Sequence, residues 1–199
     1  MLSSLDRMFL QYVGEAKRWP PERTLSELEK FRGGGWKASS SSPSEFAFLK
    51  SAGCPLDVWL DRAEGAVQFV DAVPIEPVLK EALSEFRNYS LIALTTNSPW
   101  LLAKAVVIQL ELEELVDAIF CPRAPHRFVK FPPAGKPSPS LYSEISKLYG
   151  VAASAVLVVG DRDAIDLTPA RVLGMQVQLV RGPVDVARVL NERRRGVHA

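Results

Sequence analysis

The chain has 199 residues, of which 47% are hydrophobic, and its formal net charge is +1. This length suits one large domain, or one domain with a small cap, and the apolar content is enough for a sizeable core. Because the chain is nearly neutral, a broad nucleic-acid-binding surface is not expected. Because it has no apolar run of about 18 residues, a membrane-spanning helix is not expected either.

The first third of the chain is predicted to be helical. Apolar side chains recur at the spacing of amphipathic helices in the segments 5–13, 25–31, 46–49 and 58–60. Pro20 and Pro21 end the first of these segments. Thr24 and Glu27 stand at the spacing of a capping box, which predicts that the second helix opens there. We therefore expect residues 1–70 to form a small helical bundle.

From about residue 75 the pattern alternates between helices and strands. The first predicted strand, 90–96, has almost no polar residues, as is typical of a parallel strand that is covered on both faces. Helices and strands that alternate predict right-handed βαβ units and a parallel sheet in a three-layer α/β/α fold. The predicted strands are 90–96, 118–121, 155–159 and 176–180, and the predicted helices are 77–86, 100–110, 138–149, 164–173 and 184–191.

Polar residues stand where these strands end. Thr96 and Asn97 close the first strand, Lys136 precedes a helix in Gly-Lys-Pro-Ser-Pro, and Asp161 and Asp166 follow a later strand. Ligands of open α/β sheets bind at the carboxyl ends of the strands. A hydroxyl, a lysine and two carboxylates at one such edge are the groups that hold a phosphate and a Mg²⁺ ion.

At these residues the chain resembles the haloacid dehalogenase superfamily of phosphatases. Thr96 matches the second motif of that superfamily, Lys136 the third, and Asp161 with Asp166 the fourth, over roughly residues 70–182. The resemblance implies that residues 1–70 are a helical cap and residues 71–199 an α/β core. It implies that Thr96, Asn97 and Lys136 bind phosphate, that Asp161 and Asp166 hold Mg²⁺, and that a small phosphorylated metabolite is the substrate.

The first motif of the superfamily, Asp-x-Asp-x-Thr after the central first strand, is absent from this sequence. Its leading aspartate is the nucleophile. Asp6 follows a segment that is too short and polar to be a buried strand, and Asp57 and Asp61 lie one turn apart in a helical pattern. Asp71 is the best substitute, at the end of a short strand over 67–70, but Val73 stands where the second acid would be. The same segment fits a hinge between cap and core.

The resemblance implies that the missing strand would lie between the strands that carry Thr96 and Asp161. Unpaired backbone groups at two buried edges would each cost on the order of 1–3 kcal/mol, so the gap is expected to close. The flanking strands would pair directly, another segment would fill the position, or the natural protein would begin upstream of Met1. An exposed sheet edge would also favour a homodimer.

Two functions follow from these expectations. With a nucleophile supplied upstream, the chain would hydrolyse phosphomonoesters with Mg²⁺ through an aspartyl-phosphate. Without one, it would be a non-catalytic relative that binds a phosphorylated ligand or a protein partner. Single residues could also have a purely structural role instead of binding a ligand. Thr96, Asn97 and Ser98, for example, could cap the following helix. Cys54 and Cys121 form no Cys-x-x-Cys motif, which favours a reducing cytoplasm.

Overall fold

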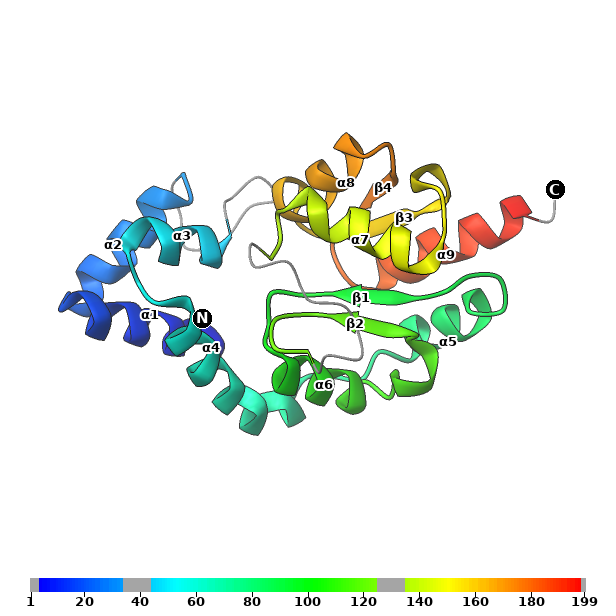
Figure 1. The fold of residues 1–199 in the computed structure, drawn as a ribbon. Helices are drawn as coiled ribbons and strands as arrows, with labels where there is room; N and C mark the ends of the chain where they lie inside the picture. The colour runs from blue at the N-terminus through cyan, green and yellow to red at the C-terminus, as the bar shows by residue number, and fades with distance from the viewer. Residues whose placement is uncertain (1–3, 34–43, 125–134, 198–199) are drawn as a thin grey trace.

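The computed structural model describes residues 4–33, 44–124 and 135–197. Its first part is helical, and its second part alternates helices with short strands (Figure 1). No helix in the described ranges is long and apolar enough to cross a lipid bilayer. The first part consists of α1 (Ser4–Lys17), α2 (Pro21–Phe31), α3 (Glu45–Ala52), α4 (Leu56–Glu64) and the connecting 3-10 helix η1 (Gly65–Ala72).

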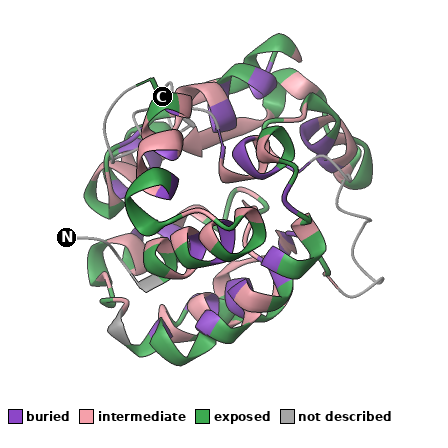
Figure 2. Ribbon diagram, turned by 90° about the vertical axis from the view of Figure 1, so that its left-hand side faces the viewer, coloured by how far each residue is buried: buried purple, intermediate pink, exposed green. Residues whose placement is uncertain are grey.

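Helices α1 to α4 share an apolar core of their own. Phe9 and Trp59 pack edge to face with their ring centroids 5.0 Å apart, and Phe9 also contacts Phe48 of α3. Leu28, which is 1% exposed, brings α2 into the same cluster. Aromatic pairs of this kind contribute about 0.5–1.5 kcal/mol beyond the burial of their surface. Buried residues accordingly lie on the faces of the helices that turn inward (Figure 2).

The start of α2 differs from the prediction. The helix begins at Pro21, three residues before the predicted capping box, and Thr24 lies inside its first turns. Proline suits the first helical position for two reasons. An N–H group there would have no partner within the helix, so its absence costs nothing, and the φ angle of proline is already helical. The Thr24 hydroxyl instead donates to the Pro20 carbonyl at 3.2 Å and is fully buried. The capping-box prediction is therefore wrong.

The second part contains parallel strands in two separate pairs. β1 (Ala93–Thr95) pairs with β2 (Ala118–Phe120), and β3 (Leu157–Gly160) pairs with β4 (Gln176–Leu179). The predicted α/β class is confirmed, with helices α5 (Pro77–Phe86), α6 (Trp100–Gln109), α7 (Pro139–Tyr149), α8 (Thr168–Val172) and α9 (Pro183–Val197) around the strands. Shorter turns are η2 (Glu113–Leu115), η3 (Ala153–Ala155) and the π-helical η4 (Asp163–Leu167).

The prediction of a strand over 90–96 covered on both faces is wrong. The strand has three residues, and all of them are only half-buried, as are the four residues of β3. Central strands of a parallel sheet are normally buried. The partial exposure has a direct cause: β1 and β3 do not pair with each other, and no strand of the described chain lies between them.

Two helices hold the strand pairs together. On α7, Leu141 and Ile145 pack against Phe120 of β2, and Tyr142 packs in a cluster with Val158 of β3. Helix α9 follows β4, yet Ala187 and Leu190 of α9 pack with α5 and with Ile92 beside β1. The α/β part is thus joined across its middle by side chains rather than by backbone hydrogen bonds.

Burial of the two cysteines gives a prediction about alkaline pH. Cys121 is 0% exposed and its thiol is free, and burial raises the pKa of this thiol from 9.0 to about 12. Burial also raises the pKa of Cys54. A thiol whose folded pKa is raised contributes stability that is complete below the unfolded pKa and is lost as the pH rises above it.

We therefore expect the free energy of unfolding to fall by about 1.4 kcal/mol between pH 8 and pH 10 through Cys121 alone. Urea unfolding at the two pH values measures this difference. Cys121→Ala lowers stability at both values, because it leaves a cavity, but removes this part of the pH dependence. An unchanged pH dependence in the variant would show that the thiol is not responsible.

Candidate functional site

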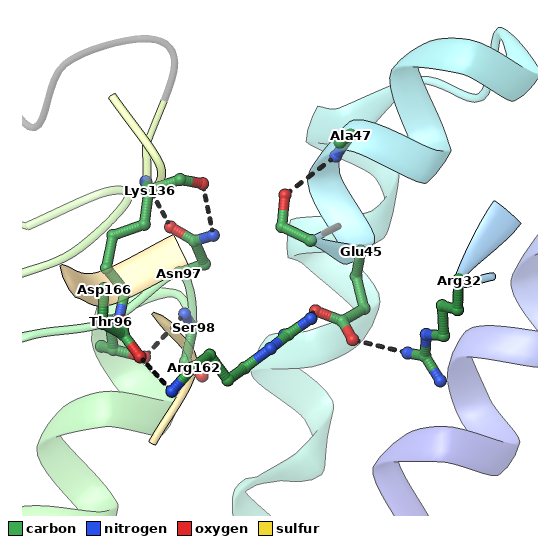
Figure 3. A network of polar contacts seen from close by, with 10 residues as sticks. Arg32, Glu45, Ala47, Thr96, Asn97, Ser98, Lys136, Arg162 and Asp166 are labelled. Atoms are coloured by element: carbon green, nitrogen blue, oxygen red, sulfur yellow. Dashed lines mark hydrogen bonds and ion pairs between the residues drawn. The ribbon is translucent and has the colours of Figure 1, made fainter. Parts of the chain in front are cut away.

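An ion pair lies at the centre of the candidate site. The Lys136 ammonium is 2.6 Å from Oδ1 of Asp166, and the two side chains are 15% and 8% exposed (Figure 3). The other oxygen of Asp166 accepts from the backbone N–H of Arg162 at 3.1 Å. The two residues come from different segments of the chain, before α7 and within η4. Burial strengthens the Coulombic attraction between them, and it makes the loss of either partner costly.

Asn97 fixes the backbone of Lys136. Its side-chain oxygen accepts from the Lys136 N–H at 2.8 Å, and its side-chain N–H group donates to the Lys136 carbonyl at 3.0 Å (Figure 3). This pair of hydrogen bonds joins the end of β1 to the segment before α7. Asn97 therefore acts on the position of the Lys136 side chain through the backbone.

Removal of this double contact should destabilise the protein. We expect Asn97→Ala to lower the free energy of unfolding by about 2 kcal/mol, because both polar groups of the Lys136 backbone lose their partner. The exposed Asn88 offers a matched control, since Asn88→Ala should change stability by less than about 0.5 kcal/mol. Urea unfolding of the two variants provides the comparison. Equal effects would mean that the Asn97 hydrogen bonds contribute no net stability.

Thr96 lies at the end of β1 with its hydroxyl in a tight turn. Its oxygen accepts from the backbone N–H of Ser98 at 3.0 Å. The hydroxyl proton remains available to a ligand. Helix α6 begins after Pro99, which has no side-chain capping hydrogen bond. The alternative that Thr96, Asn97 or Ser98 caps this helix is therefore wrong.

Asp161 and Asp166 differ in exposure. Asp161 directly follows β3 and is exposed, whereas Asp166 is 5% exposed. Asp166 packs against the end of β3 so closely that a Cβ atom on Gly160 would lie 2.5 Å from its Cβ atom. Only glycine leaves room for this approach. A π-helical turn next to a functional site is a recurring combination, and here it carries Asp166.

These residues meet at one cavity of about 310 Å³ between the helical part and the strands. We call this cavity the site pocket. All five predicted phosphate and metal residues line it: Thr96, Asn97, Lys136, Asp161 and Asp166. Asp71 does not: it is exposed and lies in η1, where the alternative prediction placed a strand over 67–70.

Three charged residues that the sequence did not single out also line the site pocket: Arg32, Glu45 and Arg162. Asp6, which the sequence analysis rejected as a nucleophile, lines it too. Glu45, in the first turn of α3, bonds Arg32 at 2.6 Å and Arg162 at 3.3 Å (Figure 3). It thereby connects the helical part to the segment after β3. Arg162 and Glu45 are 117 residues apart, so no local pattern could have predicted this contact.

The charges of the site pocket bear on metal binding. Its carboxylates outnumber its cationic side chains by one. A phosphate dianion would therefore need additional positive charge, which a divalent cation supplies. Asp161 and Asp166 are suitable oxygen ligands, but no group of three or more His, Cys, Asp or Glu side chains within the described ranges could hold a metal ion. Within the described ranges, these two carboxylates have no third such side chain beside them.

Comparisons with known proteins agree with the fold of the chain. The chain superposes on a haloacid dehalogenase phosphatase from Thermococcus onnurineus with a TM-score of 0.53 and 18% identity, over 97% of this chain and 90% of the other. A protein from Thermotoga maritima, proposed to be a beta-phosphoglucomutase, gives a TM-score of 0.50 and 17% identity, over 94% and 91%. At such identities the likeness shows the fold. No curated protein sequence matches the chain.

The sequence itself matches a family. The model of the haloacid dehalogenase-like hydrolases covers residues 41–174, which include the site residues from Glu45 to Asp166 and both strands that border the site pocket. This match spans more than half of the chain. The protein therefore belongs to the haloacid dehalogenase-like hydrolase family.

Proposed function

We propose that this protein forms the phosphate- and metal-binding part of a Mg²⁺-dependent phosphatase for a small phosphorylated metabolite. The observation that carries the proposal is the convergence of three distant segments, at Thr96–Asn97, Lys136 and Asp161–Asp166, on one site pocket. The family membership of the chain supports hydrolysis as the reaction class.

Each of these side chains has a defined task in the proposal. The Thr96 hydroxyl and the backbone N–H of Asn97 donate to the phosphoryl oxygens, and the Lys136 ammonium offsets the charge that grows on them in the transition state. Asn97 holds Lys136 in place through its backbone. Asp166 keeps the ammonium oriented toward the site pocket.

The metal would be held by Asp161 and Asp166 together with a further carboxylate. When bound, Mg²⁺ supplies positive charge for the phosphoryl oxygens. Asp161 is exposed at the end of β3 and can bind a cation directly, whereas Asp166 would have to share its carboxylate with Lys136. The third carboxylate is the one that the described part of the chain does not provide.

The same missing carboxylate is the nucleophile of the proposed reaction. Its oxygen would form a bond to phosphorus while the bond to the alcohol oxygen breaks, and the second aspartate of the same motif would protonate the leaving alcohol. Water would then attack phosphorus and give a proton to that aspartate, which releases phosphate and restores both carboxyl groups. Because the sequence has no Asp-x-Asp-x-Thr motif, we propose that a segment outside residues 1–199 supplies this group.

The size and lining of the site pocket limit the substrate. A volume of about 310 Å³ accommodates a small metabolite. Glu45 of α3, Arg32 directly after α2 and Arg162 directly before η4 also line the site pocket, and Glu45 is shared between the two arginines. We propose that these residues of the helical part select the substrate. The free, buried thiols of Cys54 and Cys121 support a cytoplasmic location.

Hydrolysis of an aryl phosphate tests the proposal, with Mg²⁺ or EDTA and with a peptide that carries an apolar strand ending in aspartate. We expect turnover only with Mg²⁺ and peptide together, and a loss of about 100-fold in kcat/KM for Lys136→Ala and for Asp161→Asn. The exposed residues Lys104 and Asp57 provide matched controls, since Lys104→Ala and Asp57→Asn should leave kcat/KM unchanged.

The second candidate function is binding at the same site pocket without hydrolysis. Without a nucleophile, the site pocket would bind a phosphorylated ligand or a protein partner and release it unchanged. The absent Asp-x-Asp-x-Thr motif favours this alternative. A folded protein that binds the peptide but shows no turnover would support it. Turnover without any peptide would instead identify an acid of the site pocket as the nucleophile, and Asp6→Asn would then be the next variant to assay.

A further inference from the structure

Three charged side chains of the site pocket form one connected set that joins the helical part to the segment after β3. One carboxylate oxygen of Glu45 lies 2.6 Å from Nη2 of Arg32, and the other lies 3.3 Å from Nη1 of Arg162 (Figure 3). All three residues line the site pocket, and we call them the arginine triad. With two guanidinium groups and one carboxylate, the triad has a formal charge of +1.

The two positive charges of the triad are little exposed to water. The side chains of Arg32 and Arg162 are 6% and 18% exposed, and that of Glu45 is 34% exposed. A guanidinium group keeps its proton in proteins, so a change of pH does not remove its charge. Positive charge that water screens poorly attracts an anion more strongly than the same charge at the surface. The triad therefore favours a negatively charged group in the adjacent part of the pocket.

The residues assigned to phosphate and metal have the opposite balance. Lys136, Asp161 and Asp166 have one positive and two negative charges, which is a formal charge of −1. A divalent cation suits that group of residues, whereas an anion suits the triad. The remaining carboxylate of the site pocket belongs to Asp6 of α1. The pocket thus offers two charged regions of different sign, and one ligand can contact both.

Arg162 is the member of the triad that links these two regions. Its backbone N–H donates to Oδ2 of Asp166 at 3.1 Å, and its guanidinium group reaches Glu45 in the helical part. Charge-assisted hydrogen bonds normally have a nitrogen–oxygen distance of about 2.7–2.9 Å. The contact of Glu45 with Arg162, at 3.3 Å, is longer than that, and the contact with Arg32, at 2.6 Å, is not. The Arg162 contact is therefore the one that a ligand can share or replace at the lower cost.

We propose that the substrate is the phosphomonoester of a small hydroxy acid, whose carboxylate binds the Arg162 guanidinium group. Both arginines of the triad already hold a carboxylate, that of Glu45, and the planar fork of arginine matches this group. The place of the phosphate beside Lys136 rests on the proposed function, whereas the carboxylate site rests on the triad. Arg162 then determines specificity, because a phosphate ester without a second charge lacks its partner.

Paired ligands test the inference. One series consists of hydroxy acids of about two to four carbons that are phosphorylated at the end opposite the carboxylate. The other consists of their carboxamides, which have the same shape without the second charge. The whole chain is titrated calorimetrically with each ligand in the presence of Mg²⁺. We expect the best acid to bind about tenfold or more tightly than its amide. Equal affinities would overturn the inference.

Substitution of Arg162 assigns the difference to the triad. Arg162→Gln should weaken binding of the acid by about tenfold or more and leave binding of the amide unchanged. Arg162→Lys should restore part of the loss, because it keeps the charge but not the fork. Arg188→Gln is the matched control, since Arg188 is 54% exposed on α9, pairs with Glu192 and lies outside the site pocket. A loss of both ligands in folded Arg162→Gln would mean that Arg162 has only a structural role.

Glu45→Gln gives an effect of the opposite sign and does not depend on the folding of the Arg162 variants. It removes the carboxylate that competes with the ligand for both arginines. We expect the acid to bind about threefold or more tightly in this variant, with binding of the amide unchanged. If the triad served only to hold the helical part against the strands, Glu45→Gln would weaken both ligands. That result would count against the carboxylate site.

Lys136→Ala separates a failure of this inference from a failure of the proposed function. If acid and amide bind equally and both are lost in Lys136→Ala, the phosphate site stands and the carboxylate site does not. If the acid binds more tightly than the amide and neither is affected by Lys136→Ala, the carboxylate site stands and the phosphate site does not. If neither ligand binds the folded chain at millimolar concentrations, both proposals are wrong.

Discussion

Replacing Asp166 with alanine is expected to lower the free energy of unfolding by about 3 kcal/mol. The Asp166 side chain is 8% exposed, and its carboxylate bonds both the Lys136 ammonium and the Arg162 backbone. Its removal leaves a largely buried ammonium without its counterion, which is the costly way to break such a pair. Urea unfolding measures the loss.

Two comparisons make this result specific. Asp166→Ala combined with Lys136→Met should be less destabilised than Asp166→Ala alone, because no charge is then left unpaired. Glu27→Ala breaks a similar pair, in which Lys30 lies 2.9 Å from Glu27 and both side chains are exposed. That change should cost less than about 0.5 kcal/mol. Equal losses for Asp166→Ala and Glu27→Ala would refute the role of burial.

Gly160→Ala is expected to lower the free energy of unfolding by about 3 kcal/mol and to disturb the site. The new methyl group would lie 2.5 Å from the Cβ atom of Asp166 and 2.9 Å from its carboxylate. A Cβ atom cannot swing aside, so the π-helical turn η4 must move, which costs about 1–3 kcal/mol or more. The movement would also separate Asp166 from Lys136.

Gly65→Ala provides the matched control. Gly65 has a φ angle of −65° and nothing within 4 Å of the added methyl group. Alanine there should be neutral or stabilise the protein by up to about 1 kcal/mol. Thermal unfolding of both variants tests the contrast. If Gly160→Ala were as stable as Gly65→Ala, the close approach of Asp166 to β3 would not be rigid.

The spacing of apolar residues along the sequence predicted most of the helices and strands. The apolar runs at 118–121 and 176–180 became strands, and the amphipathic segments around them became helices, because burial of one face dominates local structure. The start of α2 was mispredicted because Thr24 and Pro21 are both helix-start signals, and the proline prevailed. The length of β1 was overestimated, because its pairing with β2 covers only residues 93–95 and no second strand of the described chain extends it.

Site residues could be predicted only where a polar residue of a suitable type stands next to a predicted strand or helix start. Thr96, Lys136 and Asp161 stand next to strands or helix starts, and the structure places them around one pocket. Arg32 and Glu45 carry no such signal, since they reach the site pocket only through the packing of the helical part. The orienting contacts of Asn97 are likewise tertiary, because a strand-end asparagine reads equally well as a helix cap.

The absence of backbone hydrogen bonds between the two strand pairs has a consequence for how the protein opens. The pairs are joined by side chains of α7 and α9, so the weakest plane in the α/β part runs between β1 and β3. Partial unfolding should follow that plane, with β1–β2 and β3–β4 separating as two cooperative units below the global unfolding free energy. The two strand pairs would then open as separate units.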